Sequence, residues 1–167
     1  KDKIKIEKPI KVVMDCGNAA GCINGPEVFK SLGIETKELF CEPDGSFPNH
    51  HPDPTVEENL KDLILEVKNG NYDLGIAFDG DADRIGLVDE TGDIIWADQL
   101  MAIFLPEIIQ DNDDILFDVK CSQALEDMIK HYGGNPIMWK TGHSLIKQKM
   151  TELNCKLGGE MSGHIFF

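Results

Sequence analysis

The sequence has 167 residues, which is long enough for one or two compact domains with buried cores. Its formal net charge of −14 at pH 7 argues against nucleic acid or an anionic membrane as a partner. No apolar stretch approaches the ~20 residues that a membrane-spanning helix needs, so we expect no membrane segment.

The five cysteines form no CxxC pair, and an odd, scattered set suits reduced thiols better than a disulfide framework or a zinc site. The start of the chain carries charges but neither a long apolar segment nor a small-residue cleavage site, so we predict no signal peptide. Both features favour a cytoplasmic protein.

The first half of the chain alternates strand-like and helix-like segments. Apolar runs predict strands at residues 10–15, 34–40, 74–78, 85–88 and 94–96. One helix is expected from Pro26 to Gly33, because proline favours the first helical position. A second should follow a capping box made by Thr55 and Glu58, with an apolar stripe at Leu60, Leu63, Ile64 and Val67. This alternation predicts an α/β layered fold with some antiparallel pairing.

Residues 41–54 contain four prolines and must form a loop. His50 and His51 in this loop invite a metal-binding interpretation. Neighbouring histidines in a proline-rich loop are more often solvated or hydrogen-bonded turn residues, so we leave both outside the candidate site.

Three carboxylates, Asp79, Asp81 and Asp83, lie in a short loop between two predicted strands. At about 4 Å and an effective dielectric constant near 20, each pair of such charges repels by roughly 4 kcal/mol. A hard divalent cation would compensate, and Mg²⁺ would keep open positions for a phosphate oxygen. Arg84 adds one positive charge, either as a structural ion-pair partner or as a planar fork for phosphate.

Other interpretations of this loop compete with a magnesium site. An acidic surface turn is common. A calcium-binding EF-hand places Glu90 on its twelfth position, but it needs glycine where Arg84 stands and helices where we expect strands. A haloacid-dehalogenase-type phosphatase would use Asp79 as nucleophile and Asp81 as acid/base, although its pattern favours Thr or Val at Asp83. A non-catalytic cation-binding module also stays open.

The second half predicts a similar unit, with a helix near residue 100 that Pro106 kinks or ends. Strands are expected at 115–119, 136–139 and near Leu157, separated by two helices. The two halves resemble a repeat with a period near 100 residues, which suggests domains at 1–96 and 97–167. The acidic loop and the later GEMSGH loop would then follow equivalent strands, where ligands bind in α/β sheets, and could face one cleft.

The second half holds further candidates for chemistry. Glu160, Ser162 and His164 alternate in sequence, so they would share one direction if the backbone were extended. A carboxylate, a hydroxyl and an imidazole suit sugar hydroxyls, although an ordinary polar turn fits the spacing equally well. His143 precedes a helix whose free N–H groups attract anions and could move protons near neutral pH. Lys120 follows a strand end. Each of these two is also a common surface residue.

Three motifs, FDGDADR, KTGHSLIK and GEMSGH, resemble in this order and separation those of the α-D-phosphohexomutases, most closely the phosphomannomutase/phosphoglucomutase branch. CEPDGSFPNHHPDP and LFDVKC are also similar to that branch, so the resemblance covers essentially the whole chain. The family's metal loop usually has glycine where this chain has Ala82. We expect metal binding to survive if the backbone at Ala82 needs no positive φ.

The resemblance implies a four-domain protein, of which this chain would be the second domain and an incomplete third. It implies mixed-sheet α/β domains and a Mg²⁺ ion held by Asp79, Asp81 and Asp83, with Arg84 adjacent. A phosphoserine and the main phosphate-binding loop would lie in the first and fourth domains, which this chain lacks. The remaining site residues implied by the resemblance are Glu160, Ser162 and His164 for sugar hydroxyls, with Lys120 and His143 lining the active site.

The function expected from this resemblance is that of an isomerase acting on a phosphorylated hexose. It would interconvert hexose 1- and 6-phosphates through the phosphoserine and a hexose 1,6-bisphosphate. Candidates for proton transfer and phosphate orientation are His164, His143, Lys120 and Arg84. The chain alone should be inactive, because the phosphoserine domain is absent from it.

Overall fold

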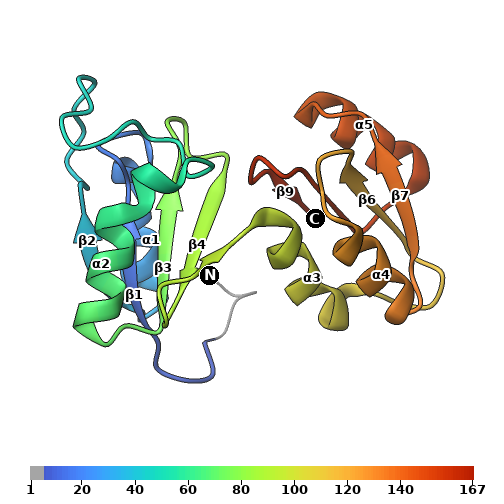
Figure 1. The fold of residues 1–167 in the computed structure, drawn as a ribbon, viewed down its shortest axis with the longest axis horizontal. Helices are drawn as coiled ribbons and strands as arrows, with labels where there is room; N and C mark the ends of the chain where they lie inside the picture. Colours follow the sequence, from blue (N-terminus) through green and yellow to red (C-terminus); the bar gives the residue numbers. More distant parts are fainter. Residues whose placement is uncertain (1–5) are drawn as a thin grey trace. The chain divides into compact units, whose positions relative to one another are not determined.

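The computed structural model describes residues 6–167, which divide into two compact units. The first unit ends at Ile95, and the second runs from Trp96 to Phe167. Each unit is built on one mixed sheet with accompanying helices (Figure 1). Within the described residues, no helix is both long and apolar enough to cross a bilayer.

Five strands form the sheet of the first unit, in the order β2-β1-β3-β4-β5. The elements are β1 (Lys11–Asp15), α1 (Gly21–Ser31), β2 (Glu35–Leu39), the 3₁₀ helix η1 (Glu57–Leu60), α2 (Lys61–Gly70), β3 (Leu74–Phe78), β4 (Ile85–Asp89) and β5 (Ile94–Ile95). The central strand β1 pairs in parallel with β2 and β3, whereas β3 with β4 and β4 with β5 are antiparallel.

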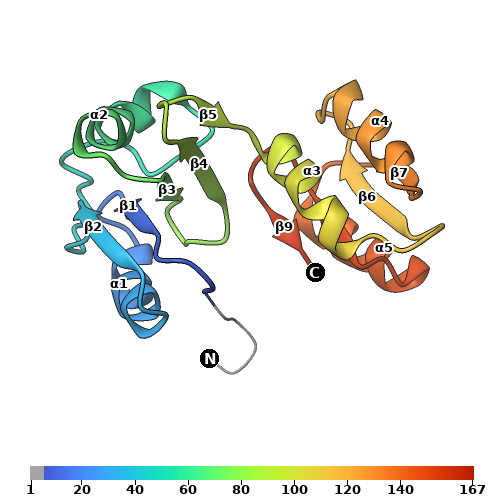
Figure 2. The same cartoon turned by 90° about the horizontal axis from the view of Figure 1, so that it is seen from below.

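Helices cover both faces of this sheet, as Figure 2 shows for α1 and α2. Because successive side chains of a strand point to opposite faces, β1 contributes to two cores. Val13 packs in a cluster with Leu63 and Val67 of α2. Met14 packs on the other face with Cys22 of α1. Burial on both faces explains why the β1 sequence is a continuous apolar run rather than an alternating one.

Four strands form the sheet of the second unit, in the order β7-β6-β8-β9. The elements are α3 (Ala97–Ile108), β6 (Asp114–Asp118), α4 (Gln123–His131), β7 (Asn135–Trp139), α5 (His143–Leu153), β8 (Leu157–Gly159) and β9 (Ile165–Phe166). Along β6, Phe117 packs with residues of α3 and α4, and Leu116 packs with Ile146 and Met150 of α5. The β6 strand is therefore also buried on both faces.

The two units share one topology, which confirms the prediction of two similar α/β domains with mixed sheets. In each, a central strand (β1 or β6) pairs in parallel with two neighbours, and the third strand in the chain (β3 or β8) pairs antiparallel with the next. The acidic loop follows β3, and the loop at 160–164 follows β8. These loops occupy equivalent positions in the two units.

The prediction that the first helix starts at Pro26 is wrong, because α1 begins at Gly21 and contains Pro26. Gly21 and Cys22 are buried, so packing against the sheet decides where this helix starts.

The sulfur of Cys16, just before α1, lies 3.1 Å from the sulfur of Cys41, and all five cysteines are free thiols.

Two other local predictions also fail. Thr55 does not cap a helix: its N–H and hydroxyl both donate to Asp53 Oδ1, at 3.1 and 2.7 Å, and α2 starts only at Lys61, after η1. Pro106 does not end α3, which continues to Ile108. A proline in the last turn removes only one intrahelical hydrogen bond, so the helix tolerates it there.

Candidate functional site

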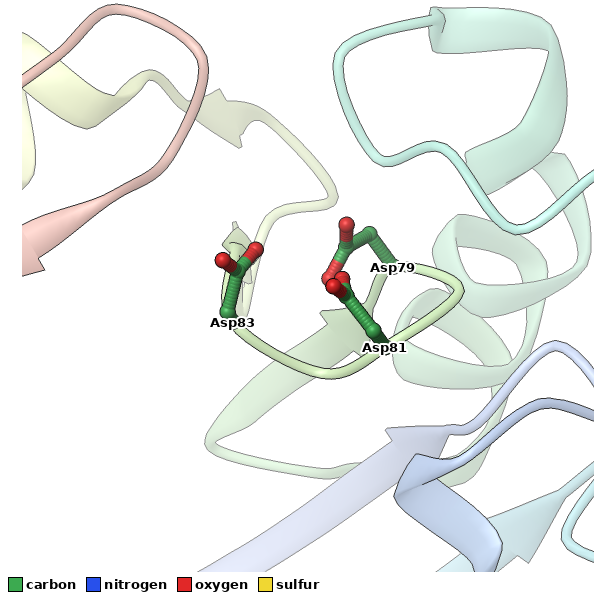
Figure 3. A group of neighbouring side chains, drawn as sticks. All are labelled: Asp79, Asp81 and Asp83. Atoms are coloured by element: carbon green, nitrogen blue, oxygen red, sulfur yellow. The ribbon is translucent and has the colours of Figure 1, made fainter. Parts of the chain in front are cut away.

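The acidic loop of the first unit gathers three carboxylates at the end of a buried strand. Asp79, directly after β3, is only 1% exposed, whereas Asp81 and Asp83 are exposed. One carboxylate oxygen from each of the three lies within 4.8 Å of the others (Figure 3). Carboxylate oxygens are the ligands that hard cations such as Mg²⁺ and Ca²⁺ prefer. The donor set therefore fits a divalent cation of this kind.

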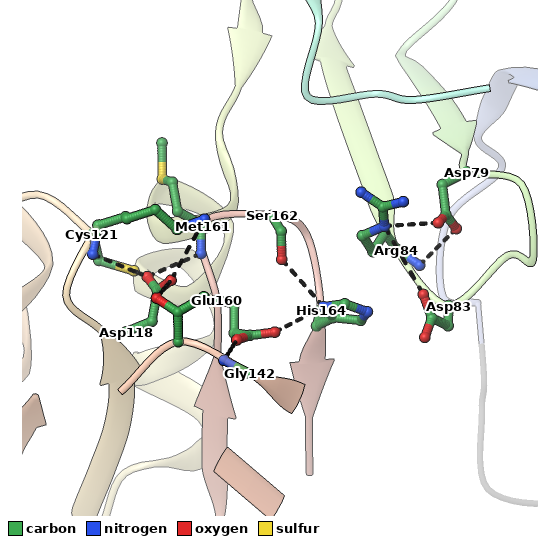
Figure 4. Close-up of polar contacts among 12 residues, drawn as sticks. Asp79, Asp83, Arg84, Asp118, Cys121, Gly142, Glu160, Met161, Ser162 and His164 are labelled. Atoms are coloured by element: carbon green, nitrogen blue, oxygen red, sulfur yellow. Dashed lines mark hydrogen bonds and ion pairs between the residues drawn. The ribbon is translucent and has the colours of Figure 1, made fainter. Parts of the chain in front are cut away.

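Arg84 partly offsets the charge of this loop. Its backbone N–H donates to Asp79 Oδ1 at 3.0 Å, and its Nε donates to Asp79 Oδ2 at 2.7 Å (Figure 4). Its guanidinium also lies 3.7 Å from Asp53 and 4.0 Å from Asp83. One guanidinium thus faces several carboxylates, so the loop keeps a net negative charge that a cation would neutralise.

Ala82 sits at the tip of the acidic loop with φ +61°. We expected alanine to leave metal binding unaffected if the backbone here needed no positive φ. The backbone does adopt a positive φ, so this condition is not met. A non-glycine residue in the left-handed region costs roughly 1–2 kcal/mol. The three aspartates converge despite this strain, which resides in the backbone and removes no ligand atom.

His50 lies against a different carboxylate of the first unit, that of Asp15 at the end of β1. The His50 Nε2 is 3.0 Å from Asp15 Oδ2, and the Gly17 N–H donates to Asp15 Oδ1 at 2.8 Å. The hydrogen bond to Asp15 raises the pKa of His50, against the opposing effect of burial. Within the described residues, the group of convergent carboxylates does not include His50 or His51.

The β1–α1 loop also contacts the acidic loop directly. The Ala20 N–H donates to the Gly80 carbonyl oxygen at 3.2 Å. The two segments are about 60 residues apart in sequence, and this hydrogen bond fixes the base of the acidic loop to its neighbour in the sheet. Such a contact between separate loops has no signature in the sequence pattern.

The 160–164 loop of the second unit is a tight turn, so the extended backbone under which its three side chains would share one direction is not present. The Gly163 N–H donates to the Glu160 carbonyl at 3.0 Å, and the Glu160 N–H donates to the His164 carbonyl at 2.9 Å. The turn brings the three predicted side chains together. His164 Nδ1 lies 2.8 Å from Glu160 Oε2 and 3.1 Å from Ser162 Oγ (Figure 4).

Glu160 is 2% exposed, and both of its carboxylate oxygens have partners. The second oxygen accepts a hydrogen bond from the Gly142 N–H, immediately before α5. His143, the first residue of α5, is exposed, and its ring centroid lies 5.5 Å from that of His164. The structure thus brings the candidates of two separate motifs, His143 and the 160–164 loop, into one cluster.

Lys120 and Lys140 are both exposed. The Nζ of Lys120 lies 3.8 Å from Asp118 Oδ2. Asp118 ends β6 and is 0% exposed, yet nothing in the sequence analysis singled it out. The available signal was an acid closing an apolar strand, which Asp15 repeats at the end of β1.

Two family profiles match consecutive parts of the chain. The profile described as "Phosphoglucomutase/phosphomannomutase, alpha/beta/alpha domain II" matches residues 2–92. That of "alpha/beta/alpha domain III" matches residues 96–167. The chain belongs to the phosphoglucomutase/phosphomannomutase family. The acidic loop accordingly lies in a family domain II, and the 160–164 loop lies in a family domain III.

Individual members of the phosphoglucomutase/phosphomannomutase family agree with this assignment. A phosphomannomutase/phosphoglucomutase of Pseudomonas aeruginosa is 54% identical over 100% of this chain and 36% of its own length. A family structure from Burkholderia thailandensis superposes with a TM-score of 0.96 at 46% identity, covering 99% of this chain and 37% of that one. The chain therefore spans about a third of the length of these relatives.

The fold extends to more distant mutases. An N-acetylphosphoglucosamine mutase of Aspergillus fumigatus, solved in complex with GlcNAc-6P and magnesium, superposes with a TM-score of 0.66 at 18% identity. This match covers 99% of this chain and 37% of that one. At this identity the likeness concerns the fold alone.

Proposed function

We propose that the protein carrying this chain is a Mg²⁺-dependent phosphohexomutase that interconverts hexose 1- and 6-phosphates. Membership of the phosphoglucomutase/phosphomannomutase family supports the reaction class. The observation that carries the proposal is the convergence of Asp79, Asp81 and Asp83, which supplies the anionic oxygens that a phosphoryl-transfer metal requires. A phosphoserine and a hexose 1,6-bisphosphate intermediate complete the proposed cycle, with the serine outside this chain.

The acidic loop is the proposed magnesium site. Asp79, Asp81 and Asp83 would hold the ion, which when bound supplies positive charge next to the transferring phosphoryl group. Arg84 orients Asp79 through two hydrogen bonds, from its N–H and its Nε. The remaining donors of its guanidinium suit a phosphate oxygen, because the planar group presents several N–H bonds at once.

The 160–164 loop is proposed to bind sugar hydroxyls through hydrogen bonds. We assign the proton on His164 Nδ1 to the hydrogen bond with Glu160, which makes Nε2 the acceptor nitrogen of the ring. The Ser162 hydroxyl can both donate and accept. Glu160 is the most buried of the three. Each of its carboxylate oxygens has a second lone pair, which would accept a hydrogen bond from a sugar hydroxyl at the base of the loop.

His143 and Lys120 are the remaining proposed contacts. His143 stands at the first position of α5, where the backbone N–H groups of the first turn also favour a phosphate. Lys120 is exposed and carries a point charge on a flexible stem, which suits phosphate orientation. Both residues belong to the candidates for proton transfer, together with His164 and Arg84.

A turnover assay of the full-length protein tests the proposal. With MgCl₂ and a trace of glucose 1,6-bisphosphate, glucose 1-phosphate and mannose 1-phosphate should be converted to their 6-phosphates, and EDTA should abolish the conversion. The 167-residue chain alone should show no turnover, because the proposed serine lies elsewhere. Absence of conversion of either sugar by the full-length protein would refute the mutase assignment.

The dehalogenase-type alternative makes a different covalent intermediate. It requires a phosphoryl group on Asp79, whose two oxygens each accept a hydrogen bond from Arg84. Acid-quenched protein can be digested and searched for phosphorylated peptides: phosphoserine supports the mutase, and aspartyl phosphate supports the phosphatase. Calorimetry of the full-length protein with MgCl₂ addresses the third alternative, since Mg²⁺ binding by a full-length protein without any turnover would favour a cation-binding module.

A further inference from the structure

Asp118, the last residue of β6, is a buried carboxylate that accepts several hydrogen bonds. Its Oδ1 accepts from the Lys120 N–H at 3.2 Å, the Cys121 Sγ at 3.3 Å and the Met161 N–H at 3.3 Å. Its Oδ2 accepts from the Thr141 hydroxyl at 2.9 Å. Burying a carboxylate is unfavourable unless donors surround it, so these bonds keep Asp118 in place.

The donors to Asp118 come from three separate loops. These are the β6–α4 loop, the β7–α5 loop and the β8–β9 loop. Figure 4 shows Cys121 and Met161 converging on this carboxylate from different segments. Two of these loops hold proposed ligand contacts, Lys120 and the 160–164 turn, and the β7–α5 loop directly precedes a third, His143. One buried side chain thus connects all the proposed contacts of this unit.

The thiol of Cys121 contributes to this network as a neutral donor. Burial, together with the negative charge of Asp118, raises the pKa of Cys121, so the group stays protonated and can donate its S–H. The backbone donors at Lys120 and Met161 are fixed by the chain itself. Only Thr141 and Cys121 donate through side chains, and Thr141 is therefore the point at which the network can be opened without disturbing the core.

We propose that Asp118 is a positioning residue for the hexose phosphate, which it never touches: it holds in register the three loops that carry or directly precede the proposed ligand contacts of the second unit. This inference rests on the proposed function. A displacement of about 1 Å in a group that contacts the reacting substrate can lower a rate by about 10²-fold. Loosening the loops should therefore affect turnover before it affects folding.

Substitutions at Thr141 in the full-length protein test the role of the network. Thr141→Val removes the hydroxyl at nearly constant volume and should lower kcat/KM for glucose 1-phosphate by about 5- to 10-fold. Thr141→Ser retains the hydroxyl and should restore most of that loss. Thr91→Val is the matched control, because it removes a hydroxyl that donates to Asp89 at 2.8 Å in the β4–β5 turn. That control should leave the kinetics unchanged.

A direct substitution, Asp118→Asn, should lower kcat/KM by about 10- to 100-fold. It should also speed deuterium uptake at the 119–122 and 160–164 segments, which can be measured by mass spectrometry whether or not the protein turns over substrate. Faster uptake with an unchanged melting temperature supports the positioning role. Equal kinetics for the Val and Ser variants at position 141, or activity that falls only in proportion to unfolded protein, would overturn it.

Failure of the inference and failure of the proposed function are distinguishable. If the wild-type protein has no mutase activity, the proposed function fails, and the exchange measurement alone decides whether Asp118 fixes the loops. If the wild type is active but neither Thr141→Val nor Asp118→Asn changes kinetics or exchange, the function stands and the positioning role is refuted.

Discussion

The acidic loop and the 160–164 loop occupy equivalent positions after β3 and β8, yet their carboxylates differ in exposure and in hydrogen bonding. In the first, Asp81 and Asp83 are exposed and the three acids converge on one another. In the second, Glu160 is buried and accepts hydrogen bonds on both oxygens. The same place in the same topology therefore holds two different arrangements of carboxylates.

The difference comes from which donors surround each strand end. Around Glu160, the Gly142 N–H and the ring of His164 satisfy the carboxylate within the protein. Around the acidic loop, Arg84 is shared among several acids, so part of the negative charge stays uncompensated. The buried acid of the 160–164 loop is thus held by donors of its own unit, whereas the three acids of the acidic loop form a donor set that suits a divalent cation.

The largest effect predicted from this comparison is on the stability of the second unit. Glu160→Ala removes hydrogen bonds to a buried charged acceptor and should destabilise that unit by roughly 2–3 kcal/mol. Both tryptophans, Trp96 and Trp139, belong to it, so their fluorescence during urea unfolding reports this change. Glu152→Ala, on the exposed side of α5, is the control and should change stability by less than about 0.5 kcal/mol. Equal effects of the two substitutions would contradict the contrast between the loops.

The counterpart in the first unit concerns metal affinity rather than stability. Asp81→Asn removes one anionic ligand and should weaken Mg²⁺ binding about tenfold or more, without unfolding the unit. Calorimetric titration of the chain with MgCl₂ measures this affinity. Glu90→Gln removes the same charge from an exposed position outside the group of three acids and should leave the affinity nearly unchanged. An unaltered affinity in Asp81→Asn would remove the acidic loop from consideration as the metal site.

A smaller effect is expected from the ion pair between His50 and Asp15. Because the pKa of His50 is raised in the folded state, the pair stabilises the first unit fully below the unfolded pKa of about 6.5. This contribution, about 1.5 kcal/mol, is lost as the pH rises through the folded pKa. An NMR titration of the His50 ring should show a midpoint above about 6.5 that Asp15→Asn lowers. His51→Gln is the control and should leave that midpoint in place. A midpoint insensitive to Asp15→Asn would refute the pairing.

The smallest predicted effect is at Ala82, whose positive φ is the strained point of the acidic loop. Ala82→Gly should relieve this strain and stabilise the first unit by about 1 kcal/mol, reduced somewhat by the greater freedom of glycine in the unfolded chain. Slower amide exchange in β3 and β4 would record the gain. Asn71→Gly, at the left-handed C-cap of α2, is the control and should change little, since asparagine tolerates this conformation. Destabilisation by Ala82→Gly would show that alanine is not strained here.

Much of the fold could be predicted from apolar runs and turn residues. The strand at 74–78 was found with the predicted bounds, because an apolar run of five residues with a buried centre leaves few alternatives. The repeat of the two units was also predictable from the spacing of strands and glycines. The start of α1 at Gly21 was not, because it depends on burial against a sheet that is assembled from distant segments.

The limits for the candidate site have the same origin. The cluster of Asp79, Asp81 and Asp83 was visible because the three acids are neighbours in sequence. The network around Asp118 was not, since its partners Thr141 and Met161 lie 23 and 43 residues away. Hydrogen bonds across such distances depend on the topology, and no local spacing encodes them.

The close approach of Cys16 and Cys41 has a practical consequence. Their sulfur atoms, 3.1 Å apart, are about 1 Å beyond disulfide bonding distance. We expect peroxide to convert the two thiols to a disulfide, with water as the reduced product. This bond would tether the β1–α1 loop to the segment after β2. The same β1–α1 loop donates a hydrogen bond from Ala20 to Gly80 of the acidic loop. Magnesium titrations of this chain should therefore be run in a reducing buffer, with an oxidised sample alongside to reveal how far sample ageing alone alters the apparent affinity.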